Sequence, residues 1–180
     1  MRHIIAHLVR GEANDYLISL SKDLVEKFDV FPIHNRIPFH FTLKRWFELS
    51  DEDIQKLHTV LDDFAQSHTQ SDYTMNKFGN FREDVLFLDV DPSKKMQSDV
   101  LELMDALHTH PNLTFDEYDN GSDFHATLTM SALKPFDFQT IKHYLNSIQQ
   151  PNFNLKFDNI AILKKPETVW VVDRVWELEP

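Results

Sequence analysis

The sequence predicts an α+β fold in which two similar lobes, each built on a mainly antiparallel sheet with helices on the outside, enclose a central cleft. Three observations lead to this prediction: one order of strands and helices occurs twice, the pattern His-x-Thr-Leu occurs in each copy, and the longest apolar runs are strand-sized. The chain has 180 residues, enough for one compact domain. We expect pseudo-twofold lobes over roughly residues 1–82 and 83–180.

The first copy combines strand-like runs with apolar residues at helical spacing. In order, the expected elements are a strand at 3–9, a helix carrying Leu17, Leu20 and Leu24, a strand at 39–49, a helix carrying Ile54, Leu57, Leu61 and Phe64, and strand-like residues at 73–81. Ser50, with an acidic residue three positions later, is typical of the start of the second helix. The order is therefore strand, helix, strand, helix, strand.

The second copy repeats this order. The expected elements are a strand at 85–90, a helix carrying Met96, Val100, Leu103, Met104 and Leu107, a strand at 124–130, a helix carrying Phe138, Ile141, Leu145 and Ile148, and strand-like residues at 153–163 and 169–178. Pro151 closes the last helix. We infer an internal duplication, because every element of the first copy has a counterpart here.

Composition excludes several classes of function. The net charge of −11 does not suit a protein that grips long duplex nucleic acid, although it permits a small anionic ligand in a locally positive pocket. The chain has no cysteine, so no disulfide and no thiolate chemistry is expected. No apolar run is long enough to span a membrane and no signal peptide is recognisable, so we expect a cytoplasmic, monomeric protein.

The repeated motif reads HFTL at residues 40–43 and HATL at residues 125–128. In a strand, residues two apart point to the same face, so each histidine shares a face with the threonine of its own motif. Each motif leucine points the other way, into the core. A pseudo-twofold would bring both pairs together across the cleft. The alternative is two unrelated histidines, but two complete motifs at equivalent places in a duplicated chain favour a shared site.

Two imidazoles and two hydroxyls in one small volume suit an in-line displacement at phosphorus. One imidazole removes a proton from the attacking oxygen and the other protonates the leaving oxygen, since the ordinary histidine pKa near 6.5 permits both states at neutral pH. The hydroxyls of Thr42 and Thr127 can donate to the phosphoryl oxygens. His40 and His125 are thus the candidate catalytic residues, and this chemistry requires neither a metal nor a cofactor.

The pair of motifs resembles the two-histidine (2H) phosphoesterases, which include the RNA 2′,3′-cyclic phosphodiesterases also called 2′-5′ RNA ligases. The resemblance covers essentially the whole chain through the order of repeated elements. It implies a bilobal duplicated fold and metal-free hydrolysis or transfer at a 2′,3′-cyclic or 2′-5′ phosphodiester. The implied partner is an RNA end or a small nucleotide, and the resemblance does not specify which.

Five further residues are candidate substrate contacts. Lys44 lies two residues beyond the first motif threonine and would share its face, or it is simply a lysine at an exposed strand end. Arg36 lies in the loop that leads to the first motif and can meet an anion, or it is solvated. Phe81 and Tyr118 can border the site and stack on a base, and Arg82 can meet a phosphate. For Phe81 the alternative is a core position beneath a hairpin.

Two rival functions remain open at this stage. A non-catalytic module that binds RNA ends or nucleotides would keep the fold without turnover. A metallohydrolase would use some of the ten histidines, of which His108 and His110 are the most suggestive pair. No cluster of histidine and acidic residues at ligand spacing supports it, and a helix end is the simpler interpretation of that pair.

Overall fold

The computed structural model describes residues 1–119 and 121–180. Its helices are α1 (Gly11–Phe28), α2 (Asp51–Ser67), α3 (Lys94–His108) and α4 (Phe138–Ser147), with a short 3₁₀ turn at Ile33–Asn35. Its strands are β1 (Arg2–Leu8), β2 (His40–Glu48), β3 (Ser71–Met75), β4 (Phe78–Phe81), β5 (Val85–Asp89), β6 (Asp91–Pro92), β7 (His125–Met130), β8 (Phe153–Phe157), β9 (Asn159–Lys165) and β10 (Val171–Glu177). Within the described residues, no helix combines the length and the apolar character needed to cross a membrane.

The strands form three antiparallel sheets, which confirms the α+β prediction but exceeds the two sheets expected. The larger sheets have the orders β10-β9-β1-β2 and β4-β5-β7, and the third has the order β6-β3-β8. The third sheet exists because the runs 73–81 and 153–163 are each two strands. β3 and β8 pair with each other. After β3 the chain bends and enters one of the larger sheets as β4, and after β8 it bends and enters the other as β9.

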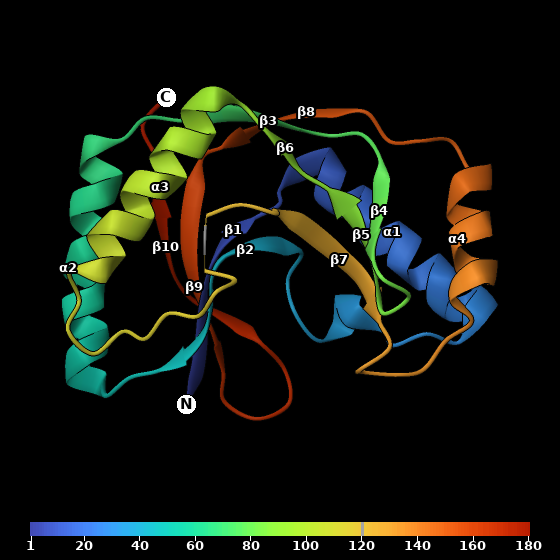
Figure 1. The fold of residues 1–180 in the computed structure, drawn as a ribbon, viewed down its shortest axis with the longest axis horizontal. Helices are drawn as coiled ribbons and strands as arrows, with labels where there is room; N and C mark the ends of the chain where they lie inside the picture. Colours follow the sequence, from blue (N-terminus) through green and yellow to red (C-terminus); the bar gives the residue numbers. More distant parts are fainter. Residues whose placement is uncertain (120) are drawn as a thin grey trace.

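The two larger sheets contain equivalent strands taken from both halves of the sequence. The order β9-β1-β2 matches β4-β5-β7, so β4 from the first half completes the sheet of the second, and β9 from the second completes the sheet of the first. Helices are exchanged too: α2 lies beside α3 at one end of the molecule, and α1 beside α4 at the other (Figure 1). The halves 1–82 and 83–180 therefore do not correspond to separate sheets.

The helices follow the expected apolar spacing. Ser50 caps α2 by accepting a hydrogen bond from the amide of Asp53, as the sequence predicts, and Ser93 and Asp137 cap α3 and α4 in the same way. The apolar faces of the helices fill one continuous core, in which Leu17, Leu57, Leu61, Val100, Leu103 and Ile141 are fully buried. Burial of these faces against the sheets supplies the main driving force for this arrangement.

Asn159 extends the pairing between β1 and β9 at the end nearest to the first motif. Its side chain is fully buried, accepts the amide N–H of Leu8 at 2.9 Å and donates to the carbonyl of Leu8 at 3.1 Å. The backbone carbonyl of Asn159 accepts a hydrogen bond from His7 Nδ1 at 2.9 Å. Since Leu8 lies opposite His40 in the ladder, this asparagine holds the strand that supports the first motif histidine.

We predict that Asn159→Ala lowers the free energy of unfolding by about 1–3 kcal/mol, because it leaves two backbone polar groups of Leu8 without partners. Urea unfolding of the variant and the wild type measures this difference. The matched control is Asn154→Ala on β8, where the side chain is exposed. Equal effects of the two substitutions would contradict the role assigned to Asn159.

Candidate active site

β2 and β7 lie side by side where the two larger sheets meet, and a cleft of about 720 Å³ opens along them. Both motif pairs line this cleft, as the sequence predicts: His40 with Thr42, and His125 with Thr127. The remaining lining residues include Phe31, Ile33, Arg36, Ile37, Leu43, Arg45, Phe81, Tyr118, Gly121, Ser122, Asp123, Met130, Leu133, Lys165, Thr168 and Trp170. The structure therefore brings together two imidazoles and two hydroxyls from strands 85 positions apart in the sequence.

Each motif strand carries a β-bulge directly after its threonine. In β2, Thr42 pairs with Ala6 but Lys44 pairs with Ile5, so Leu43 is an extra residue in the ladder. In β7, the residues after Thr127 shift in the same way, which makes Leu128 the extra residue. A bulge reverses the alternation of side chains beyond it, so the residue two after each threonine turns away from the cleft.

The bulge corrects the expectation for Lys44. Lys44 is buried, and its Nζ lies 2.8 Å from the carboxylate of Asp119, which is also buried. Arg45 lines the cleft in its place. The equivalent residue in the second copy is Met130, so the cleft is electrostatically asymmetric as expected, through a different pair of residues.

Both motif histidines are oriented by the same hydrogen bond. His40 Nδ1 donates to the carbonyl of Pro38 at 2.7 Å, and His125 Nδ1 donates to the carbonyl of Asp123 at 2.8 Å. A carbonyl oxygen can only accept, so each neutral imidazole carries its proton on Nδ1 and its lone pair on Nε2. Asp123 has a φ of 59°, in the left-handed region that aspartate tolerates better than most residues.

Two phenylalanines fix the ring of His125. Its centroid lies 4.8 Å from that of Phe81, which meets it edge to face, and 4.8 Å from that of Phe87. Gly79 on β4 makes room for this cluster, because a Cβ there would lie 2.3 Å from the Phe87 ring. Phe81 is 42% exposed, so one part of its ring remains accessible at the cleft.

The two imidazoles have different electrostatic surroundings. Burial lowers the pKa of His40 to about 4, and a positive charge on His125 would lower it further, while the hydrogen bond to Pro38 opposes the shift. Burial also lowers the pKa of His125, but there the hydrogen bond to Asp123 and the carboxylates of Asp89 and Asp123 oppose it. The difference follows from the ladder, in which Leu8 lies opposite His40 and Asp89 opposite His125.

The other predicted contacts divide into two groups. Arg36, Phe81 and Tyr118 line the cleft, whereas Arg82 does not. Arg82 lies in the exposed turn after β4 with a φ of 47°, and its carbonyl accepts a hydrogen bond from Asn80.

Sequence reasoning missed Arg45, Lys165, Thr168 and Trp170 as lining residues. Lys165 ends β9, and Thr168 and Trp170 lie in the loop from β9 to β10. This loop reaches the segment before the first motif, where the amide of Trp170 donates to the carbonyl of Arg36 at 2.8 Å. Only knowledge that β9 pairs with β1 would have placed this loop at the cleft.

The histidines that suggested a metal site have other partners. His108 Nδ1 donates to the carbonyl of Met104 at 2.7 Å, and its ring stacks on Phe115. His110 Nε2 donates to the carbonyl of Asp53 at 3.0 Å. Within residues 1–119 and 121–180, no group of three or more histidine and acidic side chains is placed to hold a metal ion.

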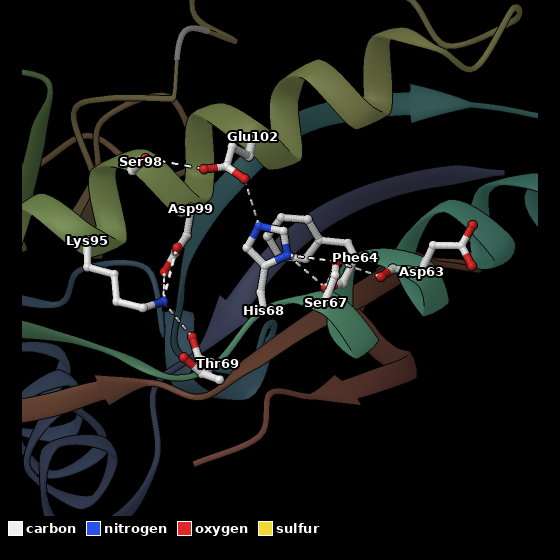
Figure 2. A network of polar contacts seen from close by, with 9 residues as sticks. All are labelled: Asp63, Phe64, Ser67, His68, Thr69, Lys95, Ser98, Asp99 and Glu102. Carbon is white, nitrogen blue, oxygen red and sulfur yellow. Dashed lines mark hydrogen bonds and ion pairs between the residues drawn. The ribbon is translucent and has the colours of Figure 1, made fainter.

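A second histidine constellation joins α2 to α3 (Figure 2). His68 Nε2 donates to the Glu102 carboxylate at 3.1 Å, and His68 Nδ1 lies 3.0 Å from Ser67 Oγ. These three residues have the composition of a serine–histidine–acid triad. However, His68 Nδ1 also forms a hydrogen bond with the carbonyl of Phe64, and the Ser67 hydroxyl donates to the carbonyls of Asp63 and Phe64 in the last turn of α2. These contacts finish the helix, so the constellation is structural.

The low pKa of His40 predicts a pH-dependent stability. Between pH 6.5 and about 4 the unfolded chain protonates this imidazole while the folded chain does not, so the free energy of unfolding falls as the pH falls through this window. We expect His40→Asn to reduce that slope, measured by urea unfolding at pH 7.5 to 4.5, with exposed His143→Asn as control. His7, whose pKa burial also lowers to about 4, contributes to the slope that remains, together with the other histidines whose pKa burial lowers, His125 among them. An unchanged slope in His40→Asn would contradict the assignment.

Comparisons with known proteins agree with this geometry. A family model described as the 2′-5′ RNA ligase superfamily matches residues 20–169, whereas no curated protein matches the chain by sequence. E. coli LigT complexed with 3′-AMP aligns with a TM-score of 0.66 at 15% identity, covering 99% of this chain and 98% of that one. Usb1 of Kluyveromyces marxianus aligns with a TM-score of 0.52 at 11% identity, covering 98% of each chain.

These structural matches show a shared fold. The family match extends over most of the chain and includes both motif strands. Together with the paired His-x-Thr strands at one cleft, it places this chain in the 2′-5′ RNA ligase superfamily, among the two-histidine phosphoesterases.

Proposed function

We propose that this protein is a metal-independent phosphoesterase that hydrolyses a 2′,3′-cyclic or 2′-5′ phosphodiester of an RNA end or a small nucleotide. The observation that carries the proposal is that His40 and His125 line one cleft and have the same tautomer. In each, a hydrogen bond from Nδ1 to a backbone carbonyl leaves the lone pair on Nε2. Each has a threonine hydroxyl two residues on, on the same cleft. This arrangement meets the needs of general acid–base catalysis at phosphorus.

In the proposed step, an imidazole Nε2 takes a proton from water as the water oxygen bonds to phosphorus. The bond from phosphorus to the leaving ribose oxygen breaks, and the second imidazole, protonated at the start, gives its proton to that oxygen. The products are a phosphomonoester and a free hydroxyl, and the protonation states of the two histidines are exchanged. Thr42 and Thr127 donate hydrogen bonds to the non-bridging oxygens, where negative charge is concentrated.

We assign the role of base to His40 and of acid to His125 in hydrolysis. Burial and the neighbouring imidazole favour the neutral form of His40, and that form accepts a proton. Burial lowers the pKa of His125 as well, but the hydrogen bond to Asp123 and the carboxylates of Asp89 and Asp123 oppose that shift, so we assign His125 as the histidine that starts protonated and donates the proton. In the reverse direction, which forms a phosphodiester, the roles are exchanged.

One of the structural relatives supports the substrate class. LigT of E. coli has been solved in complex with 3′-AMP, a nucleoside phosphomonoester of the kind that cleavage would release. Further support comes from Phe81 and Tyr118, which provide exposed aromatic rings at the cleft, where a nucleobase can stack.

We predict that His40→Ala and His125→Ala each lower kcat by at least about 100-fold, because each removes one proton-transfer group. Activity is measured on nucleoside 2′,3′-cyclic phosphates and a 2′-5′ linked dinucleotide with EDTA present. Circular dichroism and urea unfolding verify that each variant is folded. His143→Ala, which removes an exposed histidine on α4, is the matched control and should keep wild-type activity.

Full activity in both cleft variants would refute the assigned site, and loss of wild-type activity with EDTA would refute the metal-free mechanism. Tight binding of 3′-AMP with no turnover of any substrate would instead favour a non-catalytic module that binds nucleotides or RNA ends.

The acid–base assignment predicts an effect of Asp89 on the pH profile. Asp89→Asn removes a carboxylate that raises the pKa of His125, the proposed acid. The upper pKa of the bell-shaped kcat/KM profile should therefore fall, and kcat/KM should begin to decline at a lower pH than in the wild type. Loss of its ion pair also leaves Lys77 unpaired, which acts in the same direction. The control is Asp72→Asn, an exposed carboxylate on β3. A fall in the lower pKa alone would reverse the assigned roles.

A further inference from the structure

We propose that the end of the cleft formed by Arg36, Lys165 and Trp170 is a subsite for a second phosphate group of the substrate. This inference rests on the proposed function, since it concerns the same cleft, and it specifies the substrate class: a nucleotide with one phosphate beyond the group that reacts. The evidence comes from the packing, the charges and the contrast between the two ends of the cleft.

The three residues form one connected unit. The amide of Trp170 donates to the carbonyl of Arg36 at 2.8 Å, which ties the loop after β9 to the segment before β2. Lys165 Nζ lies 6.0 Å from the centroid of the Trp170 ring, and the Arg36 guanidinium lies 6.0 Å from that of Phe31. The Trp170 ring is only partly buried, against the small cluster Ile4, Ala6 and Leu163 on the face of the sheet.

Arg36 and Lys165 have no ion-pair partner among residues 1–119 and 121–180. The other cations near the cleft have carboxylate partners: Arg45 pairs with Asp116 at 3.2 Å and Lys44 with Asp119 at 2.8 Å. No carboxylate among the described residues lies within 4.0 Å of Arg36 or Lys165. In a chain with a net charge of −11, two unpaired cations at one end of a cleft form a local field that favours an anion.

The opposite end of the cleft has a different character. Around His125 lie the rings of Phe81 and Phe87, together with the carboxylates of Asp89 and Asp123. In the ladder, Phe81 lies opposite Val85, whereas the strand position that corresponds to it on β9 is Leu163, beneath Trp170. The surroundings of His125 therefore combine aromatic rings with carboxylates, whereas the end at Arg36, Lys165 and Trp170 combines two cations with an indole, so an additional anionic group is favoured at the second of these ends.

A second phosphate beside a nucleobase matches this surface. Arg36 and Lys165 can both donate to phosphate oxygens, the Thr168 hydroxyl provides another donor on the same loop, and the indole can stack on a base. Such a phosphate has two sources: the 5′-phosphate of a mononucleotide, or the next phosphodiester of an oligoribonucleotide. The chemistry is shared, and substrates of different length distinguish them.

The test compares kcat/KM for three substrates: adenosine 2′,3′-cyclic phosphate, its 5′-phosphorylated form, and a diadenosine ending in a 2′,3′-cyclic phosphate. We expect the wild type to prefer at least one of the last two by about tenfold or more, and the Arg36→Ala/Lys165→Ala variant to lose that preference. The control is Lys22→Ala/Lys94→Ala, which removes two exposed lysines on α1 and α3 and so changes net charge equally. It should retain the preference.

The substrate that is preferred identifies the source of the phosphate. A wild type that turns over all three substrates without preference overturns the subsite and leaves the proposed function intact, as does a preference that survives in the double variant. Calorimetric titration with adenosine 3′,5′-bisphosphate and with 3′-AMP tests the phosphate subsite independently of catalytic turnover, and so separates it from the proposed function. If no substrate turns over, a stronger affinity for the bisphosphate that the double variant loses still supports the subsite, and equal affinities refute it.

Discussion

Pairing between strands from opposite ends of the sequence is the constraint on which the rest of this structure depends. Ile5 pairs with Ile162, and Leu88 on β5 pairs with both Phe78 and Ala126, so each larger sheet needs strands from both halves of the chain. Neither half can complete its sheet without the other, which makes the fold a single cooperative unit despite its duplicated pattern. Because contacts so distant in sequence must form before the core closes, we expect folding to be slow for a chain of this size.

The same exchange explains why the two halves of the site are alike in geometry and unlike in chemistry. Each motif histidine donates a hydrogen bond from Nδ1 to the carbonyl of the residue two positions before it, and each motif strand has a bulge directly after its threonine. Both features follow from the path of the strand. The neighbours across the ladder are free to differ. Leu8 lies opposite His40 and Asp89 opposite His125, and burial lowers the pKa of both imidazoles, but only at His125 do carboxylates oppose that shift. The repeated strands thus give the two histidines the same geometry, and their neighbours give them different electrostatic surroundings, which is the basis of the roles proposed for them.

The helices, the motif strands and their meeting at one cleft could be predicted from the sequence because each depends on a regular period. Ser50 and the apolar spacing of α2 are confirmed to the residue, and so is the shared face of His40 and Thr42. The position of Lys44 could not be predicted, because Thr-Leu-Lys reads as ordinary alternation and the extra residue is visible only against the partner strand. Lys165 and Trp170 were missed for a related reason: their place at the cleft depends on strand pairing over long range.

Burial of Lys44 has a consequence for the second motif. Burial by itself would raise the pKa of Asp119, but hydrogen bonds from Lys44 and from the amides of Asp116 and Arg45 outweigh it and hold that pKa below its usual range. Asp119 is therefore an anion held by Lys44 and Arg45 of β2, and its carboxylate also accepts the amide of Asp116, which ties residues 116–119 to the first motif strand. The carbonyl of Asp123 in turn orients His125. The bulge after the first motif thus turns Lys44 towards Asp119 and anchors a segment that ends four residues before Asp123, the residue that orients the second motif histidine.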